Sequence, residues 1–86
     1  MKIIRINAMW CGGCLAMHKV WKKVENEYPN LEITNYDYDM DEDVVKEYNP
    51  GTLLPVAIFF KDDIEVERLN GEKSFEEIIE IINKYE

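Results

Sequence analysis

Residues 10–14 read Trp-Cys-Gly-Gly-Cys, and a β-branched run, Lys-Ile-Ile-Arg-Ile-Asn, precedes them at residues 2–7. The run predicts a buried strand and the residues from Gly12 onward predict a helix, so both cysteines lie where a strand gives way to a helix. Backbone N–H groups and the helix dipole stabilise a thiolate at such a position. The Cys-x-x-Cys spacing brings the second sulfur within reach of the first. We therefore predict that Cys11 is an exposed attacking thiolate and that Cys14 resolves the resulting mixed disulfide.

The segments on either side of the motif alternate between strand and helix patterns. Apolar residues at three- and four-residue spacing predict the helices, and short β-branched or aromatic runs predict the strands. Asp41 is expected to cap the second helix, and Ser74 with Glu77 forms a capping box for the last one. The predicted elements are strand 2–7, helix 12–28, strand 31–38, helix 41–48, strand 56–60, strand 64–69 and helix 74–85. This β-α-β-α-β-β-α order predicts one α/β domain over residues 1–86, with a mixed four-stranded sheet covered by helices on both faces.

The composition favours a cytoplasmic protein whose cysteines serve chemistry. No apolar run approaches the roughly 20 residues of a membrane-spanning helix, and the first six residues are too short and too charged for a signal peptide. Two cysteines are too few for a disulfide-stabilised scaffold. A bridge between cysteines so close in sequence would also close a very small loop and add little stability.

The charge distribution is uneven along the chain. The net charge of −8 argues against nucleic acid and anionic membranes as partners. The first 24 residues contain five basic side chains and no acid, and positive charge near a thiol favours the thiolate. The acids of residues 37–43 lack the spacing and central glycine of a calcium loop, so we interpret them as a solvated face. They are Asp37, Asp39, Asp41, Glu42 and Asp43.

Taken together, the strand, the Trp-Cys-Gly-Gly-Cys motif, the helix and Leu54-Pro55 before the third strand resemble the thioredoxin superfamily. The resemblance covers almost the whole chain and implies the thioredoxin fold and thiol–disulfide oxidoreductase activity. It implies that Pro55 is cis and lies against the cysteines, and that the backbone at Leu54 pairs with a substrate chain. It further implies that Trp10 flanks the nucleophile and that Gly71 leaves space near the active site.

The same resemblance implies the partners of the protein. We expect protein disulfides as substrates, an NADPH-linked flavoprotein reductase or glutathione as the electron donor, no bound cofactor or metal, and a monomer. Glutaredoxins carry Thr-Val-Pro before the third strand, whereas this chain carries Leu53-Leu54-Pro55, which weakens the case for a glutathione site.

Two positions near the motif, Gly13 and Arg5, depart from the thioredoxin pattern. Thioredoxins usually carry Gly-Pro between the cysteines, whereas this chain carries Gly12-Gly13. Each glycine lowers the helix propensity of the first turn by roughly 1 kcal/mol. Arg5 stands six residues before the first cysteine, where many thioredoxins bury an acid. Either Arg5 holds a thiolate or another group performs the proton transfer. His18 lies one helical turn after Cys14 on the same face and could accept its proton, although a packed or surface histidine is the commoner role.

Two other classes of function compete with the redox interpretation. Met9 extends the motif to Met-x-Cys-x-x-Cys, the Cu(I)-binding loop of small copper chaperones. Those proteins follow a β-α-β-β-α-β order that ends on a strand, whereas residues 74–85 predict a terminal helix. The chain could also be a binding module whose cysteines are incidental. The predicted element order favours the redox interpretation.

Overall fold

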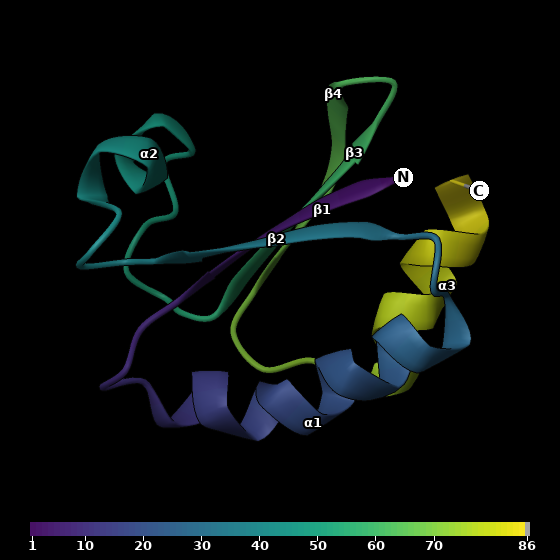
Figure 1. The fold of residues 1–86 in the computed structure, drawn as a ribbon, viewed down its shortest axis with the longest axis horizontal. Helices are drawn as coiled ribbons and strands as arrows, with labels where there is room; N and C mark the ends of the chain where they lie inside the picture. Colours follow the sequence, from purple (N-terminus) through teal and green to yellow (C-terminus); the bar gives the residue numbers. More distant parts are fainter. Residues whose placement is uncertain (86) are drawn as a thin grey trace.

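The computed structural model describes residues 1–85, which form three helices and a four-stranded sheet (Figure 1). The predicted β-α-β-α-β-β-α order is confirmed, and the predicted boundaries differ from the observed ones by a single residue at most. Within this part of the chain, no helix is long and apolar enough to cross a membrane. The elements are β1 (Lys2–Asn7), α1 (Gly12–Glu27), β2 (Glu32–Asp37), α2 (Glu42–Glu47), β3 (Val56–Lys61), β4 (Ile64–Asn70) and α3 (Phe75–Tyr85).

The sheet is mixed, as predicted, with the strand order β2-β1-β3-β4. β1 pairs with β2 in parallel, and it pairs with β3 in antiparallel orientation; β3 and β4 form an antiparallel hairpin. β1, β2 and β4 therefore run in the same direction and end at one edge of the sheet. β3 begins at that edge, so Leu54-Pro55 and the Trp-Cys-Gly-Gly-Cys motif come together there.

Helices cover both faces of the sheet, with α1 and α3 on one side and α2 on the other (Figure 1). Side chains alternate between the faces of a strand, so Ile3 and Phe59 pack toward α1 and α3 whereas Ile4 and Ile58 pack toward α2. The α1–α3 cluster contains Ile3, Met17, Trp21, Val24, Ala57, Phe59, Ile78, Ile81 and Ile82. The α2 cluster contains Ile4, Ile6, Ala8, Cys11, Cys14, Val45, Leu54, Val56 and Ile58.

Both predicted helix starts are observed, but only one of them has the expected side-chain cap. The Ser74–Glu77 capping box is confirmed, since the Ser74 Oγ accepts the Glu77 N–H (3.1 Å) and the Glu77 carboxylate accepts the Ser74 N–H (2.8 Å). Asp41 occupies the N-cap position of α2, as predicted, but among the described residues its carboxylate accepts the N–H of Asp37 (2.8 Å) and no N–H of α2. Asp37 in turn accepts the N–H groups of Asp39 and Met40, so these acids stabilise the turn between β2 and α2.

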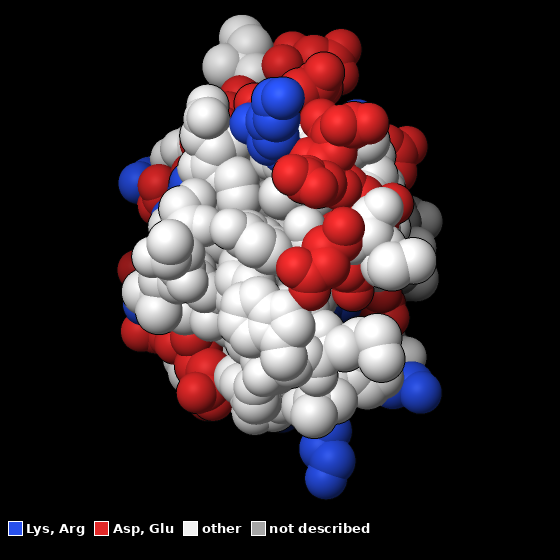
Figure 2. Space-filling model, turned by 90° about the vertical axis from the view of Figure 1, so that its left-hand side faces the viewer, with Lys and Arg blue, Asp and Glu red and all other residues white. Residues whose placement is uncertain are grey.

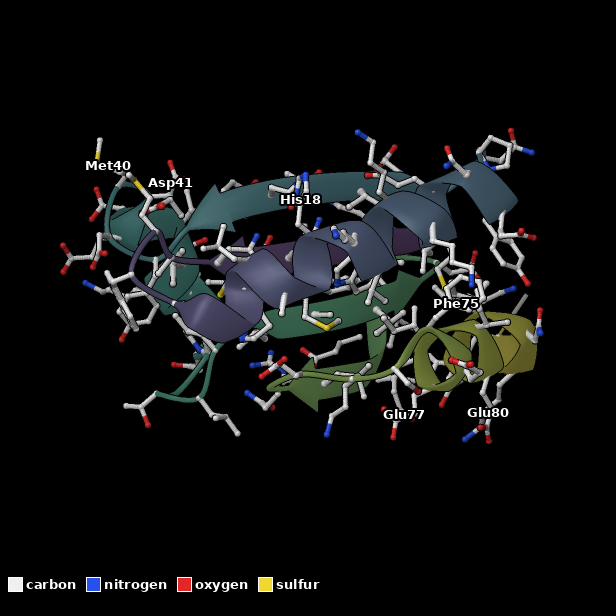
Figure 3. The ribbon with its side chains drawn as sticks, turned by 90° about the horizontal axis from the view of Figure 1, so that it is seen from below. His18, Met40, Asp41, Phe75, Glu77 and Glu80 are labelled. Carbon is white, nitrogen blue, oxygen red and sulfur yellow. The ribbon has the colours of Figure 1, made fainter. Side chains whose placement is uncertain are left out.

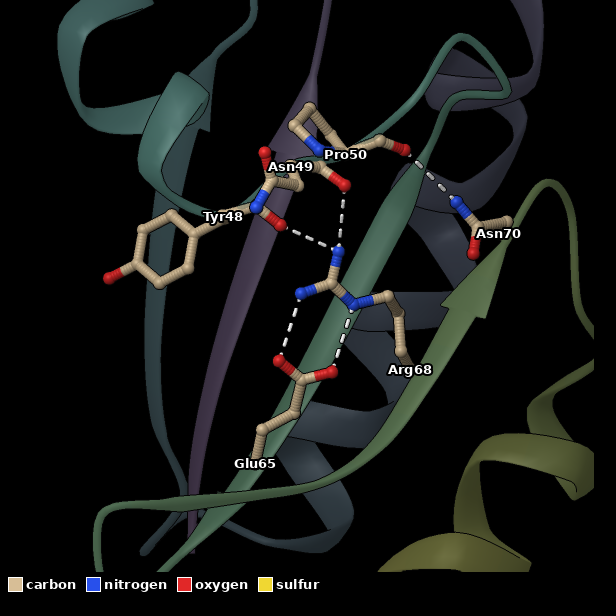
Figure 4. Close-up of polar contacts among 6 residues, drawn as sticks. All are labelled: Tyr48, Asn49, Pro50, Glu65, Arg68 and Asn70. Carbon is tan, nitrogen blue, oxygen red and sulfur yellow. Dashed lines mark hydrogen bonds and ion pairs between the residues drawn. The ribbon is translucent and has the colours of Figure 1, made fainter.

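Arg68 of β4 holds the segment that leads from α2 to Leu54 and Pro55, just before β3 (Figure 4). Its Nη1 donates to the carbonyl oxygens of Tyr48 (2.6 Å) and Asn49 (3.0 Å). Glu65 accepts from the other side of the guanidinium, through Nε (3.0 Å) and Nη2 (2.9 Å), and so fixes its orientation. This bidentate arrangement suits the planar guanidinium and ties the α2–β3 connection to the edge strand.

A matched pair of substitutions in the hairpin tests the placement of the core. Ile58 is 0% exposed and Ile64 is 67% exposed. Ile58→Val should lower the free energy of unfolding by about 0.5–1.5 kcal/mol because it removes a buried methyl group. Ile64→Val makes the same chemical change in solvent and should have almost no effect. Urea denaturation of both variants checks this, and equal losses would contradict the assigned burial.

Candidate active site

Cys11 occupies the N-cap position of α1, as the sequence predicts. Its backbone is extended (φ −93°, ψ 108°), and its Sγ accepts the backbone N–H of Cys14 at 3.1 Å. The prediction that Cys11 is exposed is wrong, because the residue is 7% exposed and packs with Ala8 and Leu54 in the α2 cluster. The Cys11 sulfur therefore lies among apolar side chains, and the backbone N–H of Cys14 is directed at it.

Cys14 lies one turn into α1 and is also a free thiol that is 7% exposed. Burial, together with a hydrogen bond to the Cys11 side chain, raises the pKa of the Cys14 thiol to about 11. The backbone of Ala8 and the cation of Arg5 lower that pKa, but their effect is smaller. Cys14 therefore keeps its proton at neutral pH.

The cis-proline loop meets the start of α1, as the resemblance implies. The Leu54–Pro55 peptide is cis, and Pro55 Cδ lies 3.4 Å from the point that a Cβ on Gly13 would occupy. Gly71 donates its N–H to the Pro55 carbonyl (2.7 Å) and has φ +86°, which a side chain would strain. A Cβ on Gly12, by contrast, would meet no atom of residues 1–85 within 4 Å.

Trp10 projects into solvent beside the cysteines and is held from the side of β2. It is 64% exposed, and its indole Nε1 donates to the Asp39 carboxylate at 2.6 Å. Its ring contacts Tyr38 edge-on, with 6.0 Å between the centroids. The sequence interpretation of Asp39 as part of a solvated face missed this role. The parallel pairing of Asn7 with Asp37 was the available signal, because it places the residues after β1 beside those after β2.

Arg5 and His18 both line the same hollow as Cys14, between α1 and the β1–β2 edge. The hollow has a volume of about 490 Å³. Arg5 is 7% exposed, and its guanidinium carbon lies 4.9 Å from the centroid of the Trp21 ring. Burial lowers the pKa of Arg5, and the charge of Glu25 on α1 opposes that shift. His18 is exposed on α1 and projects on the side of β2 (Figure 3).

The geometry assembles almost every residue predicted for the site. Cys11, Cys14, Leu54 and Pro55 come together at one edge of the sheet, Trp10 and Gly71 flank them, and Arg5 and His18 lie behind Cys14. Glu72 was not predicted: its Cγ lies 3.1 Å from the position of a Cβ on Gly13. Its place directly after Gly71 was the only signal in the sequence.

A Cys-x-x-Cys pair at the start of the first helix, facing a cis-proline in a β-α-β-α-β-β-α fold, defines the class of thioredoxin-fold proteins. The family model described as Thioredoxin matches residues 1–84, and the chain belongs to this family. The chain is 32% identical over 84 residues to a thioredoxin of Chlamydia trachomatis, covering 98% of this chain and 81% of that protein.

Solved structures agree with this assignment. A thioredoxin from Nicotiana alata superposes with a TM-score of 0.89 at 28% identity, covering 98% of this chain and 71% of that one. The Fasciola hepatica thioredoxin superposes with a TM-score of 0.88 at 27% identity, covering 99% of this chain and 80% of that one. Family and fold support a thiol–disulfide oxidoreductase. The terminal helix α3 departs from the order of the copper chaperones, so the metal-binding alternative is not supported.

Removing the charge of Arg5 should raise the pKa of Cys14 further. The cation favours the thiolate, so Arg5→Met, which keeps an apolar stem over Trp21, removes an influence that lowers the thiol pKa. The measurement is a pH titration of the cysteine ¹³Cβ shifts in the reduced protein. Lys22→Met is the matched control, because Lys22 lines the same hollow but does not shift Cys14. An unchanged Cys14 titration in the Arg5 variant, or an equal change in the control, would contradict the assignment.

Proposed function

We propose that this protein is a dithiol reductant of protein disulfides, with Cys11 as the nucleophile and Cys14 as the resolving thiol. The observation that carries the proposal is the pairing of a helix-capping sulfur with a protonated neighbour. Cys11 Sγ accepts the Cys14 N–H at 3.1 Å, and the Cys14 thiol has a pKa of about 11. Both sulfurs lie beside the cis-proline loop, where a substrate chain can pair with the backbone at Leu54.

In the first step, the Cys11 thiolate attacks one sulfur of the substrate disulfide. A bond forms between Cys11 Sγ and that sulfur, the substrate S–S bond breaks, and the other substrate sulfur leaves as a thiolate. The Cys14 N–H is directed at the attacking sulfur, which lies at the N-terminus of α1.

In the second step, Cys14 loses its proton and attacks Cys11 Sγ. The mixed disulfide breaks, the second substrate sulfur leaves as a thiolate, and the two electrons of the dithiol have passed to the substrate. Because the pKa of Cys14 is raised, this step needs a proton acceptor. We assign that role to His18, which opens onto the same hollow, and we assign to Arg5 the stabilisation of the Cys14 thiolate.

The oxidised protein must then be reduced again. We propose that an NADPH-linked flavoprotein reductase is the electron donor, with glutathione as the alternative, and that the protein works as a monomer in the cytoplasm, where disulfide reductants are kept reduced. Membership of the thioredoxin family supports the first donor.

Reduction of insulin with dithiothreitol as the electron source tests the assigned roles. Cys11→Ser should lower the rate to the uncatalysed background, because the first bond cannot form. Cys14→Ser should still attack once and then accumulate a covalent adduct with the substrate chain, which mass spectrometry detects. Near-UV circular dichroism controls for folding of both variants. A Cys11→Ser protein as active as the parent would refute the proposal and favour a module with incidental cysteines.

The midpoint potential of the Cys11–Cys14 couple tests the direction of electron flow. A reductant should titrate near about −270 mV, the value typical of thioredoxins, whereas a disulfide-forming oxidant lies near about −120 mV. Equilibration of the protein with dithiothreitol at graded ratios of oxidised to reduced reagent gives this value. A potential near about −120 mV would exclude the reductant role and would leave the thiol–disulfide chemistry intact.

A further inference from the structure

Five large apolar side chains remain exposed around the cysteine motif, and we call their surface the redox face. They are Met9 (88% exposed), Trp10 (64%), Leu15 (72%), Met40 (82%) and Leu53 (60%). Met9 and Trp10 directly precede Cys11. Met40 follows the aspartate that binds the Trp10 indole, and Leu53 lies 3.5 Å from the point of a Cβ on Gly71. Exposed apolar side chains gathered around a reactive group indicate an interaction site.

Carboxylates border the redox face on the side of β2. Residues 37–43 contain five acids and no base, and Asp39 touches the face directly through its 2.6 Å bond to Trp10. Asp39 and Glu42 also line an open hollow of about 510 Å³ beside α2, together with Lys46. Figure 2 shows acidic side chains gathered at the level of α2, with uncharged surface below them. In Figure 3, Met40 and Asp41 lie together at this end of the molecule.

Another carboxylate borders the redox face from the opposite side. Glu72 follows β4, and β4 and β2 are the two edge strands of the sheet. The Glu72 side chain is exposed and lies against the first turn of α1, with its Oε2 3.4 Å from the position of a Cβ on Gly13. The redox face therefore has a carboxylate at each side, Asp39 beside Trp10 and Glu72 beside Gly13.

We infer that the redox face selects substrate segments that carry lysine or arginine beside the reactive disulfide, together with an apolar residue. This inference rests on the proposed function and specifies its substrate class. On this inference, a segment paired with the backbone at Leu54 has Asp39, which binds Trp10, on the side of β2 and Glu72, which contacts the first turn of α1, on the side of β4. Complementary charge raises the association rate and disfavours acidic segments, and both effects weaken as salt screens them.

Three cyclic peptide disulfides that differ only in the two residues flanking one cysteine test the inference. The flanking residues are lysine, glutamine or glutamate, and kcat/KM for reduction is measured with dithiothreitol as the electron source at low and high salt. The lysine peptide should react about tenfold faster than the glutamate peptide at low salt, with the glutamine peptide between them. High salt should bring the three rates together. Each rate is corrected for direct reduction by dithiothreitol.

Paired variants show whether the named carboxylates cause the preference. Asp39→Asn combined with Glu72→Gln should reduce the lysine-to-glutamate ratio severalfold, and the amide oxygen of residue 39 can still accept the Trp10 N–H. Glu27→Gln combined with Glu80→Gln changes the net charge equally at the last residue of α1 and in the middle of α3, away from the cysteines, and should leave the ratio unchanged. An equal reduction in both double variants would overturn the local assignment.

The outcomes separate this inference from the proposed function. Equal rates for the three peptides at low salt would overturn the charge selection while the reductase activity stands. A faster reaction of the glutamate peptide would overturn it as well. Failure to reduce any of the peptides above the background would overturn both.

Discussion

The burial of β1 and β3 on both faces is the constraint on which the rest of the structure depends. Each central strand alternates its side chains between two helical layers, so Ile3 and Ile4, or Ile58 and Phe59, enter different clusters. A chain leaving β1 must cross the sheet edge before it can cover either face. The loop from Ala8 to Cys11 makes that crossing, and α1 begins where it ends. The cysteines thus lie at the edge where β2 and β4 also end and β3 begins, which is why four segments distant in sequence meet there.

Within this frame, burial and hydrogen bonding give the two thiols different properties. Cys11 and Cys14 have the same small exposure, but one sulfur receives a backbone N–H at the helix start and the other lies a turn deeper. Cys14 consequently retains its proton, although the positive charge of Arg5 on β1 lowers the pKa of its thiol. A buried cation in this position is tolerated because its guanidinium stacks on Trp21 and interacts with the charge of Glu25. The position that carries an acid in many thioredoxins here carries a group that favours a thiolate.

The secondary structure and the cysteine pair could be predicted from the sequence because both depend on local patterns. Periodicity and the Ser74–Glu77 capping box act over a few residues, and every element of the described chain was predicted. The contacts of Trp10 with Asp39 and of Gly13 with Glu72 span distant segments, and nothing in the local pattern distinguishes those acids from solvated ones. The exposure of Cys11 was predicted wrongly for the same reason. Cys11 is buried in a cluster that includes Leu54 and Val56, which only the folded sheet brings together with it.

The two glycines between the cysteines have unequal consequences for the site. A Cβ on Gly12 would meet no other segment of the described chain within 4 Å. The missing side chain at residue 12 therefore affects the flexibility of the first turn and no packing contact. Gly13 is crowded, since a Cβ there would lie 3.1 Å from Glu72 Cγ and 3.4 Å from Pro55 Cδ. A proline at residue 13, the common residue of thioredoxins, would contact both groups, and the Glu72 side chain would have to move by at least a few tenths of an ångström. The glycine lets Glu72 pack directly against the first turn of α1, so Gly13 and Glu72 form a single feature of this site.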